Sequence, residues 1–173
     1  AANGHALGIA PDATILPVRT TATGAVGDAR RQAQGIQWAV DNGATVLCLA
    51  FAHSEPDITL ERAIRYALDH DVVVVAGVGN KPDEGLLYPA AYPGVVGAAG
   101  VDRDGNHAEF SVVSPAADLA APAVQIMVPT TRSIASTGYA RSNGTSDATA
   151  IIAGVAALIR AKYPELSAED VIH

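Results

Sequence analysis

A serine and an asparagine in this sequence are placed where they could take part in nucleophilic catalysis. Ser146 ends the segment 143–146 (Asn-Gly-Thr-Ser), directly ahead of a run rich in Ala, Ile, Val and Leu. A glycine permits a sharp turn, and the start of a helix offers free N–H groups and the positive end of the dipole. Asn80 follows four valines on the glycine-rich segment 77–80. These positions predict that Ser146 is a nucleophile. They also predict that the Asn80 amide and the Ser146 N–H donate hydrogen bonds to an oxyanion.

Each of these features also has a purely structural interpretation. A threonine or serine such as Thr145 or Ser146 commonly caps a helix, and Gly79-Asn80 is ordinary turn chemistry. The functional interpretation therefore depends on the segments that accompany the two residues in the rest of the chain.

Composition and charge exclude several classes of protein. The chain has 173 residues, of which 49% are apolar and 17% charged, as in one domain with a sizeable core. A net charge of -7 and the lack of a basic cluster argue against a nucleic-acid partner. The single Cys48 excludes an intrachain disulfide and a multi-cysteine metal site, and we expect it to be a small buried hydrophobic residue. No apolar run is long enough to cross a bilayer.

Strands and helices alternate along the predicted secondary structure. We expect strands over residues 13–19, 44–51, 72–76 and 95–101, and helices over 28–41, 58–70 and 148–161. Short strands or loops are expected over 110–113, 117–120 and 125–128, and a hairpin-like turn over 102–106.

This alternation predicts a mostly parallel sheet with helices on both faces. The runs 44–51 and 72–75 are continuously apolar, as in strands buried on both faces, and the helix after Ser146 is apolar on nearly every side, as in a buried central helix. Ligands bind beyond the carboxyl ends of such strands, which is where the loops after Ala50 and Ala76 begin.

The chain as a whole resembles the subtilases, the subtilisin-like serine proteases, and in particular their mycosin-like branch. Six segments match in family order: 8–13 with 15–19, 35–44, 73–80, 88–95, 118–122, and 144–146 with 153–158. The resemblance implies a three-layer subtilisin-like α/β fold, incomplete at the N-terminus. Residues 1–173 would then be the C-terminal portion of a single catalytic domain.

The resemblance also implies a function and a set of site residues. It implies a serine endopeptidase in which Ser146 attacks a peptide carbonyl and Asn80 stabilises the oxyanion. An extended polypeptide substrate would bind by strand addition. The expected substrate-binding residues are Ala50, Phe51, Ala52, Gly77, Val78, Gly79 and Thr145. No cofactor or metal is expected, although some relatives carry calcium. The implied location is extracellular or in the cell envelope, secreted or membrane-anchored.

The rest of the catalytic triad is not found in these residues. Subtilases order the triad Asp, His, Ser along the chain, and the first two would precede Gly8. The family histidine is followed by Gly-Thr, whereas His5 is followed by Ala6-Leu7. We therefore expect the missing N-terminal part of the domain to be a required partner, and the chain by itself to be inactive.

Two departures from the family pattern bear on the site. After the serine, residues 147–151 (Asp-Ala-Thr-Ala-Ile) replace the usual Met-Ala-Ala-Pro-His and place the charge of Asp147 near the oxyanion. Residues 48–53 replace Asn-x-Ser-Leu-Gly-Gly with larger side chains, which predicts a narrower groove.

Two other functions compete with the protease. A catalytically silent subtilase-like module could bind extended peptides or act as a scaffold. A dinucleotide-binding domain, suggested by the glycine spacing 94–100, lacks the Gly-x-Gly turn and a following helix.

Overall fold

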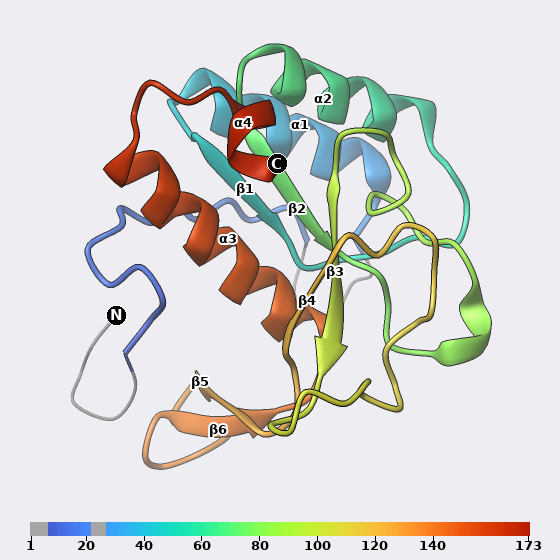
Figure 1. Ribbon diagram of the computed structural model, residues 1–173, viewed down its shortest axis with the longest axis vertical. Coiled ribbons are helices and arrows are strands. Elements are labelled where there is room, and N and C mark those ends of the chain that lie inside the picture. Colours follow the sequence, from blue (N-terminus) through green and yellow to red (C-terminus); the bar gives the residue numbers. More distant parts are fainter. Residues whose placement is uncertain (1–6, 22–26) are drawn as a thin grey trace.

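The computed structural model describes residues 7–21 and 27–173, and a parallel sheet forms its centre (Figure 1). Four strands lie in the order β1-β2-β3-β4, and every neighbouring pair is parallel. Their bounds are Val46–Leu49 for β1, Val73–Gly77 for β2, Val96–Val101 for β3 and Leu119–Pro122 for β4. The order follows the chain, so each strand lies beside the one that precedes it.

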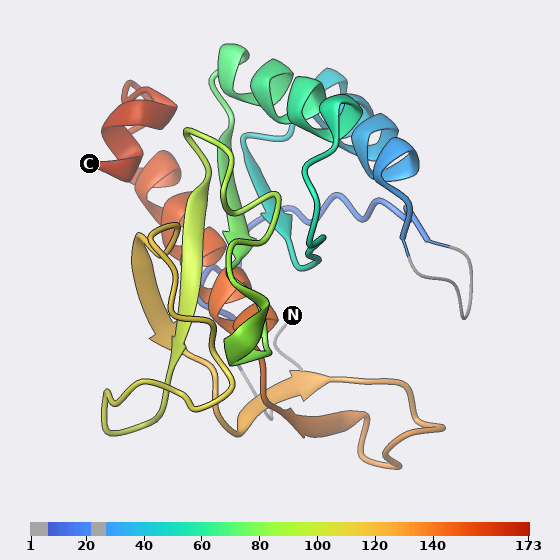
Figure 2. The ribbon, with the colours of Figure 1, turned by 90° about the vertical axis from the view of Figure 1, so that its right-hand side faces the viewer.

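Helices cover both faces of this sheet, which confirms the predicted three-layer α/β architecture. Helices α1 (Ala29–Asp41) and α2 (Ile58–Asp69) lie on one face, and α3 (Thr145–Lys162) and α4 (Ala168–Ile172) on the other (Figures 1 and 2). Side chains of β2 alternate between two cores: Val74 packs towards α1 and α2, and Val73 packs towards α3. Because both faces of β2 are covered, its valine run is buried throughout.

Side-chain caps fix where the first two helices begin. The Asp28 carboxylate accepts from the Arg31 N–H, and the Asp57 carboxylate accepts from the N–H groups of Thr59 and Leu60. Such a cap stabilises a helix by about 1 kcal/mol. The predicted helices over 28–41 and 58–70 are confirmed to within a residue at each end.

An antiparallel strand pair projects from the body of the molecule and leads into α3 (Figure 2). It joins β5 (Ile126–Pro129) to β6 (Tyr139–Ser142). A short strand or a loop was predicted where β5 lies, and β6 was not predicted. Its four residues have no apolar alternation that distinguishes them from a loop.

One of the predicted strands does not form. Residues 13–19 join no ladder and are exposed along most of their length, because no other described strand offers them hydrogen-bond partners. Side chains hold the segment instead: Ile9 lies against Gly154 of α3, and Val18 lies against Gly35 of α1. Residues 110–113, expected as a short strand or a loop, form a loop.

Burial of β1 and α3 is less complete than predicted. β1 is the edge strand of the described sheet and is shorter than 44–51, so Cys48 is exposed rather than buried. Helix α3 buries its sheet-facing side, but Val155 is 43% and Leu158 45% exposed on its other side. Apolar composition alone does not distinguish a helix covered all round from one covered on a single side.

Candidate active site

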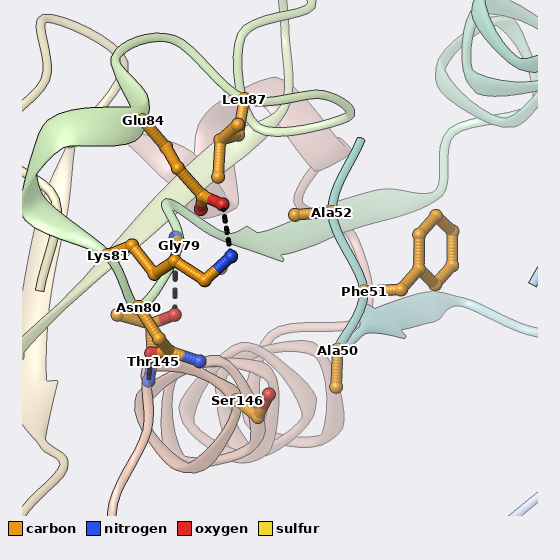
Figure 3. Close-up of a pocket in the computed structure, with 11 residues that line it drawn as sticks. Ala50, Phe51, Ala52, Gly79, Asn80, Lys81, Glu84, Leu87, Thr145 and Ser146 are labelled. Carbon is orange, nitrogen blue, oxygen red and sulfur yellow. Dashed lines mark hydrogen bonds and ion pairs between the residues drawn. The ribbon is translucent and has the colours of Figure 1, made fainter. Parts of the chain in front are cut away.

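A cavity of about 270 Å³ opens where β1, β2 and α3 come together (Figure 3). The carboxyl ends of the two strands and the first turn of α3 enclose it, at the sheet edge where the topology predicts ligands. Every residue predicted for the site lines this cavity except Val78: Ala50, Phe51, Ala52, Gly77, Gly79, Asn80, Thr145 and Ser146. Segments almost a hundred residues apart in the sequence thus meet at one place.

Ser146 is the second residue of α3 and is exposed to the cavity. The turn before it is anchored by the Gly144 N–H, which donates to the Ala123 carbonyl over 3.0 Å. Within residues 7–21 and 27–173 its hydroxyl has no hydrogen-bond partner. The hydroxyl is therefore free to face a bound carbonyl, beside the N–H groups at the start of the helix.

Asn80 is held by the same helix start. The Thr145 N–H donates to Asn80 Oδ1 over 2.7 Å. Since the oxygen of the amide is engaged in this way, its nitrogen faces the cavity on the side of Ser146 (Figure 3). An amide donor and a hydroxyl that face one cavity form the arrangement expected for stabilising a tetrahedral oxyanion.

Thr145 joins the helix to the loop that carries Asn80. Its side chain is 2% exposed, and its Oγ1 accepts from the Gly79 N–H over 3.3 Å. Gly77 lies so close that a Cβ there would come within 2.9 Å of Thr145 Oγ1. The close approach of loop and helix requires glycine at position 77, and it fixes Asn80 relative to Ser146.

The segment after β1 forms the opposite wall of the cavity. Ala50 and Ala52 point their methyl groups towards the cavity, while the Phe51 ring points away and lies edge-on to His53 (Figure 3). Larger side chains at 48–53 were predicted to narrow the groove. Of these, the Ala52 methyl faces the cavity and the Phe51 ring does not. Backbone groups of 50–52 make no hydrogen bond within the described part of the chain. They are available to an extended peptide.

Val78 departs from the prediction. Its side chain is 1% exposed within the core, and its N–H donates to the Ala98 carbonyl of β3. Alternation along the extended chain turns Val78 inward while its neighbours Gly77 and Gly79 face the cavity.

Three lining residues were not predicted. Lys81, Glu84 and Leu87 line the cavity on the side away from Ser146, and Lys81 Nζ lies 2.9 Å from Glu84 Oε1 (Figure 3). The hydrogen bond with Glu84 raises the pKa of Lys81. Their position in the sequence, within seven residues after Asn80, could have indicated that they lie at the site.

No histidine of the described chain lines the cavity. His53 Nε2 is hydrogen-bonded to Gln32 Oε1 over 2.6 Å. His70 Nδ1 lies 2.8 Å from the Tyr66 carbonyl oxygen. His5 lies outside the described residues.

A carboxylate lies next to the nucleophile position. Asp147 Oδ2 is buried and has no hydrogen-bond partner among the described residues. The dipole at the helix N-terminus stabilises the negative charge of this carboxylate. The incomplete hydrogen bonding of the carboxylate destabilises the same charge.

The model of the family described as "Subtilase family" matches residues 1–173. The chain belongs to the subtilase family. This match confirms the family predicted from the six ordered segments.

Curated subtilases with protease names resemble the chain over most of its length. A thermostable alkaline protease of Halalkalibacterium halodurans is 35% identical over 158 residues, which cover 91% of this chain and 43% of the relative. Subtilisin Savinase of Lederbergia lenta is 35% identical over 161 residues, covering 93% of this chain and 58% of the relative. The chain thus spans about half the length of the curated relatives that it matches.

Solved subtilase structures share the fold. A cold adapted subtilisin-like serine proteinase matches with a TM-score of 0.85 at 25% identity, covering 95% of this chain and 60% of that structure. MycP1, described as a serine protease and an essential component of the type VII (ESX-1) secretion system, matches with a TM-score of 0.72 at 27% identity, covering 84% of this chain and 49% of that structure. A mycosin is therefore among the structural neighbours of this subtilase.

Two further properties bear on the environment of this subtilase. None of its described helices combines the length and apolar character that crossing a bilayer requires. Within residues 7–21 and 27–173, no three His, Cys, Asp or Glu side chains gather closely enough to hold a metal ion.

Proposed function

We propose that this chain supplies the nucleophile, the oxyanion site and the substrate cavity of a serine endopeptidase. One observation carries the proposal: Ser146 and the Asn80 amide face the same cavity, with Asn80 held in place by the Thr145 N–H. The protease names of its subtilase relatives support the same activity.

The reaction is acyl transfer. Ser146 Oγ bonds to the peptide carbonyl carbon while its proton passes to a base, and the carbonyl oxygen becomes an oxyanion beside the Asn80 amide. The C–N bond then breaks, and the leaving amine takes the proton from the base. Water next attacks the acyl carbon and gives its proton to the base. The bond to Ser146 Oγ breaks, and the base returns the proton to that oxygen.

The proposed base and its orienting carboxylate lie in a segment of the parent protein that precedes Gly8. Subtilases order their triad Asp, His, Ser, so this chain would contribute only the last member. Without that segment, Ser146 is a poor nucleophile. The proposed reaction requires no cofactor.

We propose that the substrate is an extended polypeptide that pairs with the backbone of 50–52. That segment continues from β1 past the end of the β1–β2 ladder, and its backbone groups make no hydrogen bond to any described residue. A peptide added there would present its carbonyl to Ser146.

An extracellular or cell-envelope location is the final part of the proposal. It is supported by the resemblance to MycP1, described as part of a secretion system. Fractionation of cells that express the parent protein, followed by immunodetection, tests it. Recovery of the protein only in the cytoplasm contradicts it.

Labelling of the full-length parent protein with a fluorophosphonate tests the proposed activity. We expect an adduct on Ser146, located by mass spectrometry, and its loss in Ser146→Ala. The variant Ser142→Ala, four residues upstream on β6, is the matched control and should label normally.

The competing scaffold function predicts a different result. A folded parent protein with its Asp and His present, but with no adduct on Ser146, would establish the catalytically silent module instead. Binding of an extended peptide by that unlabelled protein would then assign the cavity a binding role alone.

A further inference from the structure

The segment 50–52 is attached to the rest of the molecule at its two ends. At one end, Leu49 is the last residue of β1, in register with Ala76 of β2. At the other end, His53 and Tyr88 form an isolated antiparallel bridge. The His53 N–H donates to the Tyr88 carbonyl over 2.7 Å, and the Tyr88 N–H donates to the His53 carbonyl over 2.9 Å. Because the backbone between these points makes no hydrogen bond to any described residue, its position depends on the two ends.

The His53 side chain adds a third hydrogen bond to the second end. Its Nε2 lies 2.6 Å from Oε1 of Gln32, a residue of α1. An amide oxygen can only accept, so the imidazole nitrogen is the donor. The Phe51 ring lies edge-on to the same imidazole. The family pattern has glycine at position 53, which has no side chain to make this bond, so the connection to α1 is a feature of this sequence.

Gln32 is well placed to hold the imidazole. It lies near the start of α1 and is 2% exposed. A Cβ on Gly27 would collide with the Gln32 amide nitrogen, so Gly27 encloses the amide on the side away from His53. The cap that Asp28 provides fixes the start of the same helix. Close packing and the cap therefore restrict the positions that the Gln32 oxygen can take.

A substrate that binds by strand addition needs the backbone groups of its partner strand to be in place. A partner strand that moves must be ordered when the peptide binds, and this ordering lowers the affinity. The segment 50–52 has a ladder at one end only, so its order depends on how firmly His53 is held.

We propose that His53 and Gln32 are positioning residues, whose hydrogen bond holds the segment 50–52 where a substrate peptide pairs with it. This inference rests on the proposed function, because strand addition at 50–52 is part of that function. Neither residue lines the cavity that contains Ser146. Loss of their bond should therefore weaken the binding of an extended peptide without slowing the cleavage of a bound one.

Steady-state kinetics of the full-length parent protein test the proposal with the variant Gln32→Leu. Leucine fills the buried position but offers no acceptor to His53. For a peptide long enough to pair with 50–52, we expect KM to rise about two- to tenfold, the value of one intramolecular hydrogen bond, with kcat unchanged. For an ester of a single amino acid, which is too short to pair, KM should not change.

Two variants at position 53 extend this test. His53→Leu removes the donor at a partly exposed position, where the fold should tolerate the change, and it should raise KM as Gln32→Leu does. His53→Gln supplies an amide N–H in place of the imidazole N–H and should retain most of the wild-type affinity.

Amide hydrogen exchange in the free protein separates positioning from direct contact with the peptide. In Gln32→Leu, the His53 and Tyr88 N–H groups that form the bridge should exchange about two- to tenfold faster. In His53→Gln they should exchange at close to the wild-type rate. A side chain that only touched the substrate would not alter exchange in its absence.

A matched control removes a different side-chain hydrogen bond of α1. The Tyr66 hydroxyl donates to Asp41 Oδ1 at the other end of that helix, so Tyr66→Phe should leave KM and the exchange of the bridge unchanged. Faster exchange with an unchanged KM, or a raised KM with unchanged exchange, overturns the proposal. An equal rise of KM for the short ester also overturns it.

Peptide binding to Ser146→Ala versions, together with fluorophosphonate labelling, separates this inference from the proposed function. A parent protein that is not labelled, but whose peptide affinity falls in Gln32→Leu, contradicts the protease and leaves the positioning role intact. A labelled protein whose peptide affinity and exchange do not respond to Gln32→Leu contradicts the positioning role and leaves the protease intact.

Discussion

The Thr145 N–H donates to Asn80 Oδ1 over 2.7 Å, and this hydrogen bond joins the start of α3 to the loop after β2. The residue that precedes the nucleophile thereby orients the proposed oxyanion donor. Thr145 Oγ1 adds a second connection to the same loop through the Gly79 N–H. The proposed nucleophile and the proposed donor are consequently linked through Thr145.

Replacing Asn80 with alanine should lower kcat of the full-length protein about 10²–10³-fold with little change in KM. This range is the known cost of losing one oxyanion donor in subtilisin, a member of the same family. Steady-state kinetics measure it. Asn42→Ala, at the end of α1, is the control and should keep wild-type kcat. A loss of less than tenfold in Asn80→Ala would mean that the amide is not the oxyanion donor.

Thr145→Val should reduce both the stability and kcat. The buried Gly79 N–H loses its partner, which costs about 1–3 kcal/mol, and the loop that carries Asn80 loosens. Thr145→Ser keeps the hydroxyl and should retain most of kcat. Urea unfolding and steady-state kinetics report the two effects. A loss of kcat in Thr145→Ser but not in Thr145→Val would show that the methyl, not the hydroxyl, matters.

Asp147→Met should raise both the melting temperature and kcat. Removing a buried carboxylate oxygen that has no partner among the described residues gains about 1–3 kcal/mol, more than the about 0.3–1 kcal/mol lost at the helix N-terminus. Removing a negative charge beside the oxyanion should raise kcat several-fold. Calorimetry and kinetics test the two effects. A lower melting temperature would indicate that the helix dipole dominates.

Acid should weaken the packing of α3 and α4 through Asp71. The hydrogen bond from Arg160, followed by that from the Ala168 N–H, lowers the pKa of Asp71. A carboxylate with a lowered folded pKa stabilises the protein at neutral pH, and this contribution is lost as the pH falls below about 4. Because Asp71 is half exposed, the effect should stay within about 1 kcal/mol.

The variant Asp71→Asn tests this contribution. Asparagine tolerates the φ of 60° at this position, so the backbone should be retained. Urea unfolding at pH 7 and pH 3 should show a smaller loss on acidification than in the wild type. Asp69→Asn, on the same turn, should behave as the wild type. An identical acid loss in Asp71→Asn and the wild type would contradict the role of Asp71.

Gly97→Ala should destabilise the sheet by about 3 kcal/mol or more. A Cβ at this position would lie 1.6 Å from the Ala116 carbonyl oxygen, which is backbone and cannot rotate away. Gly43→Ala is the comparison: its Cβ meets open space, and its φ of 82° should cost only about 1–2 kcal/mol. Thermal unfolding of both variants measures the difference. Similar losses in the two variants would show that the segment around Ala116 moves away from β3 at little cost.

The sequence predicted the elements whose signals are local. The helices 28–41 and 58–70 and the valine run of β2 were predicted, because helix periodicity and continuous burial leave their pattern within a few residues. The segment 13–19 has strand-like composition, yet forming a strand depends on a neighbouring strand, which composition does not encode. For the same reason the edge position of β1, and with it the exposure of Cys48, could not be predicted.

The site was predicted where a motif carried it. Ser146 and Asn80 belong to recognisable segments, and both face the cavity. Lys81 and Glu84 belong to none, and only their spacing across a short turn brings them together. The inward orientation of Val78 follows from strand alternation and could have been predicted by extending β2 through residue 78.

The segment 77–87 has an inner part that contacts α3 and an outer turn, and the two parts should tolerate substitution differently. Gly77, Gly79 and Asn80 contact Thr145 at the start of α3, so a change at any of them should disturb the proposed oxyanion site. Lys81 and Glu84 project from a surface turn outside the strand ladder. The outer turn can therefore vary in sequence without moving the residues that lie against α3.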